Sequence, residues 1–82
     1  MRLILKEVTL KKTNFESTNL TRVNFKGASL VEAIFKNSNL FEADFTGANI
    51  LNANFEGANL NNATWVDGKK CSLGSIGVCK IN

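Results

Sequence analysis

The chain has 82 residues and a net charge of +3, and it contains 44% hydrophobic and 21% charged residues but no proline, tyrosine or histidine. This length fits a single small domain, and the composition is too apolar for a disordered chain and too interrupted by polar residues for a membrane-spanning one. Without histidine, the chain lacks both the commonest general base and the commonest metal ligand.

The N-terminal end begins with a short apolar run, Leu3-Ile4-Leu5, that charged residues interrupt at once. A secretory signal needs a longer run, so we expect none in this chain, and we expect no transmembrane segment either. Up to Asp67, seven basic residues balance seven acidic ones, so the positive excess resides on Lys69, Lys70 and Lys80. A basic tail of this kind is either an ordinary solvated surface or a contact with an anionic neighbour.

Large apolar residues recur at every fifth position between residues 5 and 65. All thirteen of these positions are apolar: Leu5, Leu10, Phe15, Leu20, Phe25, Leu30, Phe35, Leu40, Phe45, Ile50, Phe55, Leu60 and Trp65. The residue two places earlier is alanine or serine from Ala28 onward, and the residue between them is usually asparagine. A period of five fits neither a helix nor a long strand. It fits a short extended piece followed by a corner, with the small and the large residue facing inward.

The corners show a signal of their own, because glycine or asparagine often stands two residues after the large apolar one. These residue types tolerate the positive φ that a tight turn often requires. They are Gly27, Asn37, Gly47, Asn52, Gly57 and Asn62. Four such sides make a coil of 20 residues, in which residues twenty apart stack about 4.8 Å from each other.

The 20-residue coil predicts which side chains form columns. Two columns are aromatic: one contains Phe15, Phe35 and Phe55, and the other contains Phe25, Phe45 and Trp65. Aliphatic columns lie between them. On the outside, the same register predicts ion pairs and an amide ladder. The predicted outer columns are Arg22 with Glu42, Lys12 with Glu32, Glu16 with Lys36 and Glu56, and Asn19 with Asn39 and Asn59.

Three consecutive units show the repeat most clearly: Ala48-Asn49-Ile50, Ala53-Asn54-Phe55 and Ala58-Asn59-Leu60. They resemble the consensus Ala-(Asp/Asn)-Leu-x-x of the pentapeptide-repeat proteins, and the resemblance extends from Leu3 to Asp67. It implies an all-β fold, a right-handed quadrilateral β-helix of about three coils with a C-terminal cap. The resemblance leaves the molecular task open, because members of this family do many things.

The five-residue rhythm ends at Gly68, so we divide the chain into a repeat domain, 1–67, and a C-terminal capping segment, 68–82. The end of a solenoid exposes core and unpaired backbone, which require a cap. We expect Leu73, Ile76 and Val78 to cover Trp65. The pattern of tryptophan, glycine and cysteine residues between 65 and 79 also resembles the C-terminal end of some bacterial pentapeptide-repeat proteins of the cell envelope.

The two cysteines, Cys71 and Cys79, allow two interpretations. As a disulfide they close a nine-residue loop worth roughly 2–3 kcal/mol, a large share of the stability of so small a core. As free thiols they are small apolar residues of the cap. Two cysteines without histidine cannot complete a zinc site, and their spacing is not that of a redox motif. We favour the disulfide, which predicts an extracytoplasmic location, the periplasm or cell envelope, whereas free thiols predict a cytoplasmic one.

We expect no enzymatic activity, and therefore no small-molecule substrate, cofactor or metal site. The seven carboxylates all fall on predicted outer positions, where water solvates them, and no nucleophile can be paired with a histidine base. Nucleic acid is not an expected partner either, because the chain shows no groove that combines aromatic with basic residues.

Four apolar residues occupy positions where the repeat normally carries polar ones: Val31, Ile34, Phe41 and Leu51. Val31 and Leu51 stack on one predicted side, Ile34 lies around the adjacent corner, and Phe41 belongs to a different side. Single exposed apolar residues are common on protein surfaces. The alternative is that Val31, Ile34 and Leu51 form an interaction patch for another copy of the chain or another protein.

These observations predict a non-enzymatic structural or protein-interaction module. The alternative function is that of a DNA mimic that regulates or protects a topoisomerase. Three coils give a rod of about 16 Å, which matches only about five base pairs of DNA. The neutral repeat surface also lacks the negative stripe that such a mimic requires.

Overall fold

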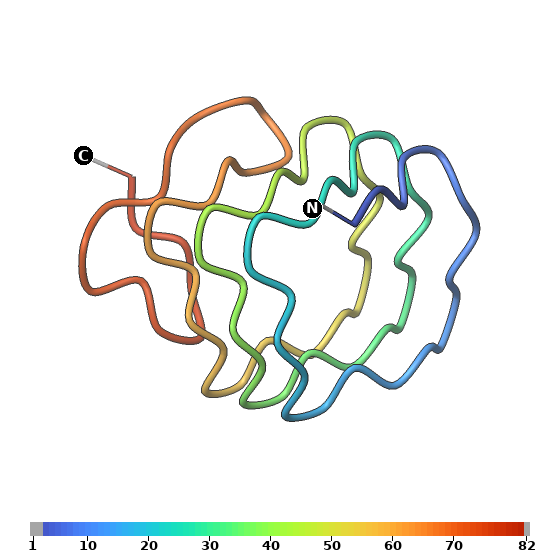
Figure 1. Ribbon diagram of the computed structural model, residues 1–82, viewed down its shortest axis with the longest axis horizontal. Helices are drawn as coiled ribbons and strands as arrows, with labels where there is room; N and C mark the ends of the chain where they lie inside the picture. The colour runs from blue at the N-terminus through green and yellow to red at the C-terminus, as the bar shows by residue number, and fades with distance from the viewer. Residues whose placement is uncertain (1–2, 82) are drawn as a thin grey trace.

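The computed structural model describes residues 3–81, which wind as a coil around one axis (Figure 1). No residue in that range belongs to a helix, and isolated parallel β-bridges join the coils in place of continuous strands. Each parallel bridge connects residues twenty positions apart, from Ile4 with Asn24 to Asp44 with Thr64. The fold is therefore β-helix-like, and the length of its coil confirms the 20-residue register.

Two-residue turns recur every five residues, from 6–7 to 66–67. The second residue of each turn has a positive φ from Glu7 through Asn62. Half of these positions carry the predicted glycine or asparagine. The others carry charged residues or serine with φ between 57° and 62°: Glu7, Lys12, Ser17, Arg22, Glu32 and Glu42. Sequence analysis predicted a corner in each of these units but not its positive φ, because stacking between coils imposes the left-handed conformation on residues that do not favour it.

Backbone hydrogen bonds explain how the coil sets its corners. The N–H of Glu32 donates to the carbonyl of Leu51 in the next coil at 2.9 Å, and the N–H of Gly27 donates to Thr46 at the same distance. From Glu7 to Gly47, each second corner residue donates such a hydrogen bond to the next coil, whatever its side chain is. Because an unpaired backbone group is costly, these bonds hold the positive φ in place.

The frequent asparagine at the bridged position also has a local cause. Its side-chain Oδ1 accepts a hydrogen bond from the backbone N–H two residues later, at the start of the turn. The distance is 2.8 Å from the N–H of Glu16 to Asn14 and 2.9 Å from the N–H of Glu56 to Asn54. Asparagine thereby stabilises the corner that follows it.

The core consists of stacked side chains inside the coil. In one aromatic column, the ring of Phe35 lies 5.1 Å from Phe15 and 5.0 Å from Phe55, with interplanar angles of 9° and 4°. The second column stacks Phe25 on Phe45 at 5.3 Å. The two columns meet edge to face across the interior, as for Phe25 and Phe35 at 5.7 Å. Both aromatic columns are confirmed, although Trp65 meets Phe45 edge-on at 64° rather than flat.

Burial is greatest in the middle coils. Phe25, Phe35 and Phe45 are fully buried, whereas Phe15 near the N-terminal end and Trp65 near the C-terminal end are only half-buried. The coil centre therefore contributes most of the hydrophobic stabilisation. Ser38 is buried at an alanine position, and its hydroxyl donates to the carbonyl of Phe35 at 2.7 Å.

The segment after Gly68 folds back across the C-terminal end of the coil (Figure 1). It pairs with the last coil through two antiparallel bridges, Thr64 with Lys70 and Asn59 with Ile76. A disulfide joins Cys71 and Cys79, with their Cα atoms 5.0 Å apart. Ser72 and Lys80 are also joined by backbone, because the Ser72 N–H donates to the Lys80 carbonyl at 2.8 Å.

The expectation that aliphatic side chains of this segment cover Trp65 is wrong. Leu73, Ile76 and Val78 are 87%, 53% and 58% exposed, and Trp65 stays half-buried. Cys71 and Ser75 are buried instead, at 1% and 0% exposure. The residues that this segment places in the interior are therefore small, and its large aliphatic side chains point outward.

Candidate functional site

The predicted patch of Val31, Ile34 and Leu51 lies on the outer wall of the coil. Val31 and Leu51 begin the same corner in successive coils, and the Leu51 carbonyl accepts the N–H of Glu32 at 2.9 Å. Leu51 is 63% exposed and Val31 is half-buried. Ile34 is also half-buried and sits in the middle of the next side, where it bridges to Asn14 and Asn54. The register therefore aligns Val31 with Leu51 and places Ile34 around the corner from them.

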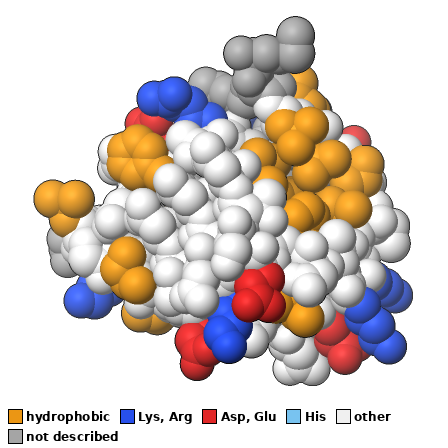
Figure 2. Space-filling view, turned by 60° about the horizontal axis from the view of Figure 1, so that its bottom comes forward, with side chains coloured by type: hydrophobic (Ala, Val, Ile, Leu, Met, Phe, Trp, Pro, Cys, Tyr) orange, Lys and Arg blue, Asp and Glu red, His pale blue; other side chains and the backbone are white. Residues whose placement is uncertain are grey.

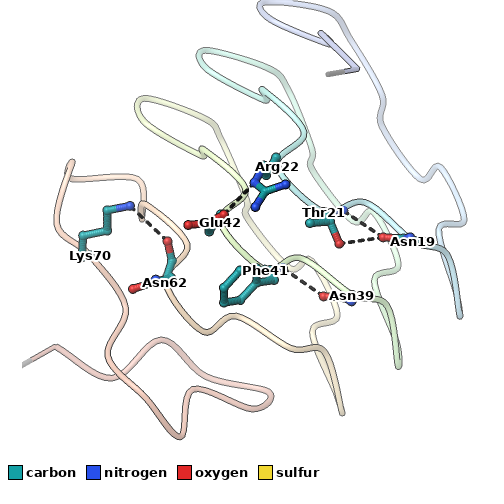
Figure 3. Close-up of polar contacts among 8 residues, drawn as sticks. All are labelled: Asn19, Thr21, Arg22, Asn39, Phe41, Glu42, Asn62 and Lys70. Carbon is teal, nitrogen blue, oxygen red and sulfur yellow. Dashed lines mark hydrogen bonds and ion pairs between the residues drawn. The ribbon is translucent and has the colours of Figure 1, made fainter. Parts of the chain in front are cut away.

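Phe41 lies on a different corner, as the 20-residue register predicts. Its side chain is half-buried, and its N–H donates to the Oδ1 of Asn39 at 3.1 Å (Figure 3). It shares this corner with Glu42 of its own coil and with Arg22 of the preceding coil, and it lies apart from the patch.

A polar hollow opens beside that corner and was not predicted from the sequence. Its volume is about 410 Å³, and it is lined by Arg22, Glu42, Asp44, Thr64 and Lys70. The Nε of Arg22 lies 2.7 Å from the Oε1 of Glu42, and Lys70 Nζ donates to the carbonyl of Asn62 at 3.2 Å (Figure 3). The lining therefore brings together three successive coils and the first residues of the folded-back segment.

Asp44 is the most strongly held carboxylate of this hollow. Burial raises its pKa, but hydrogen bonds from the hydroxyl and the N–H of Thr46, together with the charges of Lys26 and Lys70, outweigh burial and lower the pKa below its ordinary value. The two Thr46 bonds measure 2.6 and 2.9 Å, and Lys26 Nζ lies 3.8 Å from Asp44 Oδ2. The Asp44 carboxylate is thus ionised, and it already binds Thr46 and Lys26 on the outer wall.

The outer columns agree with the sequence in part. The ion pair of Arg22 with Glu42 is confirmed, and Lys36 lies 3.5 Å from Glu56. The amide ladder is present between Asn59 and Asn39, with a donor–acceptor distance of 3.4 Å. Among residues 3–81, neither Lys12 with Glu32 nor Glu16 with Lys36 comes within ion-pair distance. The pair of Lys26 with Asp44 was missed, because its residues are eighteen rather than twenty positions apart.

Chemically, the hollow offers paired surface charges rather than a preformed centre. Within the described part of the chain, no group of three or more histidine, cysteine, aspartate or glutamate side chains is placed to hold a metal ion. Glu42 and Asp44 each face a cation, so their charges are offset where they stand. On the wall, Leu51 is exposed and stacks beside the half-buried Val31, so we take the patch of Val31, Ile34 and Leu51 as the candidate functional surface.

Comparison with known proteins establishes the family. Residues 15–64 match the family model described as pentapeptide repeats (9 copies). The chain belongs to the pentapeptide-repeat family. No curated protein matches the chain. Among residues 3–81, the structure has no helix whose length and apolar character would let it cross a bilayer.

Two solved structures are similar to this chain. One is HetL, a pentapeptide repeat protein involved in heterocyst differentiation regulation from the cyanobacterium Nostoc sp. strain PCC 7120, with 26% identity and a TM-score of 0.37. The match covers 82% of this chain and 36% of HetL. The other is a pentapeptide repeat protein from the Arabidopsis thaliana thylakoid lumen, with 21% identity and a TM-score of 0.35, covering 79% of this chain and 66% of that one. This chain therefore spans about a third of the length of the first and about two thirds of the second.

Proposed function

We propose that this chain is a non-enzymatic structural or protein-interaction module built as a right-handed quadrilateral β-helix. Four two-residue turns in each 20-residue coil support the quadrilateral shape, and the parallel bridges support the β-helix. The right-handed sense is supported by the general preference of parallel β connections for that hand. Pentapeptide-repeat proteins generally serve as structural or interaction modules, which agrees with this function.

Within this architecture, residues 1–67 form the repeat domain and residues 68–82 form the cap. The change from parallel to antiparallel pairing supports this boundary, because the first antiparallel bridge of the cap is made by Lys70. The disulfide of Cys71 with Cys79 closes the cap. Met1, Arg2 and Asn82 lie outside the described residues.

The module contacts another chain through Val31, Ile34 and Leu51. The observation that carries this proposal is the 63% exposure of Leu51 directly above Val31, at a corner position where the units on either side place lysine, threonine or glutamate. Exposed apolar residues that stack on adjacent coils form a continuous apolar strip, which gains free energy when a partner covers it. A second copy of the chain is the partner tested first.

The test is analytical ultracentrifugation of the wild type and of Leu51→Asp. We expect the wild type to form species heavier than 9.0 kDa at high concentration, and Leu51→Asp to shift the distribution toward the monomer. Leu73→Asp is the matched control, since it places the same charge at another exposed leucine and leaves the patch intact. A monomer in both the wild type and Leu51→Asp contradicts self-association through this patch.

No observation favours the alternative of a topoisomerase-directed DNA mimic. The carboxylates of Glu42, Asp44 and Glu56 each face a lysine or arginine, so the wall presents no uninterrupted acidic stripe. A gyrase supercoiling assay separates the two functions: an interaction module leaves the supercoiling rate unchanged.

A further inference from the structure

The outer surface of the cap is unusually apolar. Leu73, Ile76, Val78 and Ile81 are 87%, 53%, 58% and 43% exposed, and all four lie within nine residues of one another. Elsewhere among the described residues, the exposed large hydrophobic residues are Leu51 on the wall and Leu3, Ile4 and Val8 in the first coil. The wall therefore largely avoids such side chains, whereas the two ends of the molecule concentrate them.

Three basic residues belong to the same segment of the chain as these apolar side chains. Lys69, Lys70 and Lys80 are exposed, and they are the three charges that make the whole chain positive. Lys80 lies close to the turn of Leu73, because its Nζ is 3.5 Å from the place where a Cβ on Gly74 would be. Backbone contact agrees, since the Lys80 carbonyl accepts hydrogen bonds from both the N–H and the hydroxyl of Ser72.

The acidic residues near these lysines are few. Glu42 and Asp44 share the polar hollow with Lys70 and offset part of its charge. Asp67 accepts a hydrogen bond from the backbone N–H of Lys69 through its Oδ1. Residues 68–82 contain no acidic side chain, so Lys69 and Lys80 are the least compensated charges of the cap.

The path of the chain places the segment that follows Gly68 at one end of the coil (Figure 1). The folded-back segment lies at the left of Figure 1, and the turn to Figure 2 keeps that end on the left. Figure 2 shows separate hydrophobic side chains at this end, with a basic side chain beneath them, and a larger gathering of hydrophobic side chains at the opposite side of the view. We call Lys69, Leu73, Ile76, Val78, Lys80 and Ile81 the cap surface.

We propose that the cap surface docks on an anionic lipid bilayer. Aliphatic side chains gain free energy by entering the boundary between headgroups and acyl chains, and lysines gain by lying against negatively charged headgroups. Exposed aliphatic and basic side chains occur together here, and a lipid surface satisfies both at once. The disulfide and the two antiparallel bridges hold the cap in shape, so little ordering is needed on docking. The coil then stands on the membrane with its walls free for protein contacts.

The experiment is co-sedimentation of the full chain with large unilamellar vesicles. One set contains phosphatidylcholine alone, and the other contains about a third phosphatidylserine, which supplies the negative surface potential. We expect the anionic set to bind the chain at least tenfold more strongly, and about 1 M salt to remove most of this preference because it shortens the Debye length to about 3 Å. Since the chain has no histidine, the preference is expected to be equal at pH 6 and pH 8, to about a factor of two.

Variants distinguish the cap from the rest of the molecule. The double variant Lys69→Gln and Lys80→Gln is expected to lower the partition coefficient for anionic vesicles roughly 25-fold, because each lysine contributes about fivefold. The double variant Leu73→Ser and Val78→Ser is expected to lower the partition coefficient by at least about tenfold for both vesicle types. All four side chains are exposed or partly exposed, so the fold is expected to survive each change.

Matched controls carry the same changes at the opposite end and on the wall. Lys6→Gln with Lys11→Gln removes two exposed lysines from the first coil, and Leu51→Ser removes the exposed leucine of the wall. Neither control is expected to change vesicle binding by more than about twofold. The proposal is overturned if the wild type fails to bind anionic vesicles, or if the controls lose as much binding as the cap variants.

Discussion

Phe35 is the residue whose replacement tests the stacked core most directly. Its side chain is fully buried, and its ring has four aromatic neighbours, with centroids 5.0 Å away for Phe55, 5.1 Å for Phe15, 5.7 Å for Phe25 and 6.0 Å for Phe45. Leucine keeps most of the apolar volume but loses the four ring contacts, each worth at least about 0.5 kcal/mol. With a small cavity added, Phe35→Leu is expected to lower the free energy of unfolding by about 2–3 kcal/mol.

Phe15→Leu supplies the comparison, because the same change falls in the first coil. Phe15 is half-buried and has two aromatic neighbours, Phe35 at 5.1 Å and Phe25 at 5.9 Å. The expected loss is therefore about 1 kcal/mol. Urea unfolding followed by circular dichroism measures both values, provided that the slope m is the same for both variants. Equal losses for Phe15→Leu and Phe35→Leu would refute the claim that burial and ring stacking increase toward the middle coils.

Three further predictions concern the corners, the wall and the cap. Glu32 has a φ of 60°, so Glu32→Gly is expected to raise the free energy of unfolding by about 0.5–1 kcal/mol. Gly47→Ala is expected to lower it by about 1 kcal/mol, although a Cβ at this position has room. Thermal unfolding compares the two variants. The pKa of Asp44 is lower in the folded chain than in the unfolded one, so its stabilising contribution is present above the unfolded pKa and is lost as the pH falls through the folded pKa. Urea unfolding from about pH 6 to about pH 2 is therefore expected to show a smaller acid-induced loss for Asp44→Asn than for the wild type, and an equal loss contradicts this. Reducing the disulfide of Cys71 with Cys79 is expected to lower the free energy of unfolding by roughly 2–3 kcal/mol, measured by urea unfolding with and without reductant; an unchanged midpoint contradicts a structural disulfide.

The five-residue period was sufficient to predict the coil, because inward positions have to be apolar wherever a coil stacks on the next. It gave no warning of the positive φ at Glu32 or Arg22, whose residue types favour other conformations. At those positions the hydrogen bonds between coils outweigh local preference. Consistent side-chain columns therefore carry more information than the individual corner residues.

Prediction of the cap failed for a related reason. After Gly68 no period remains to tell an inward position from an outward one, so hydrophobicity alone suggested that Leu73 and Val78 would be buried. In the structure the antiparallel pairing of this segment places the small residues Cys71 and Ser75 in the interior. Sequence alone thus identified where the cap begins but not which face it presents.

The candidate surfaces were predictable to different degrees. Val31 and Leu51 were correctly assigned to one column, because their spacing of twenty residues matches the coil. The polar hollow was not predicted, since it combines a pair eighteen residues apart, Lys26 with Asp44, with Lys70 from the non-repetitive cap. Contacts of that kind depend on side-chain reach and on the path of the folded-back segment, which a repeat pattern does not describe.

The measurement that tests the 20-residue coil most directly is nuclear magnetic resonance of backbone protons. The account predicts nuclear Overhauser effects between the backbone protons of Ile34 and those of Asn14 and Asn54, its partners in the two parallel bridges. Contacts from Ile34 to residues ten positions away, or a series between residues three apart as in a helix, would contradict it.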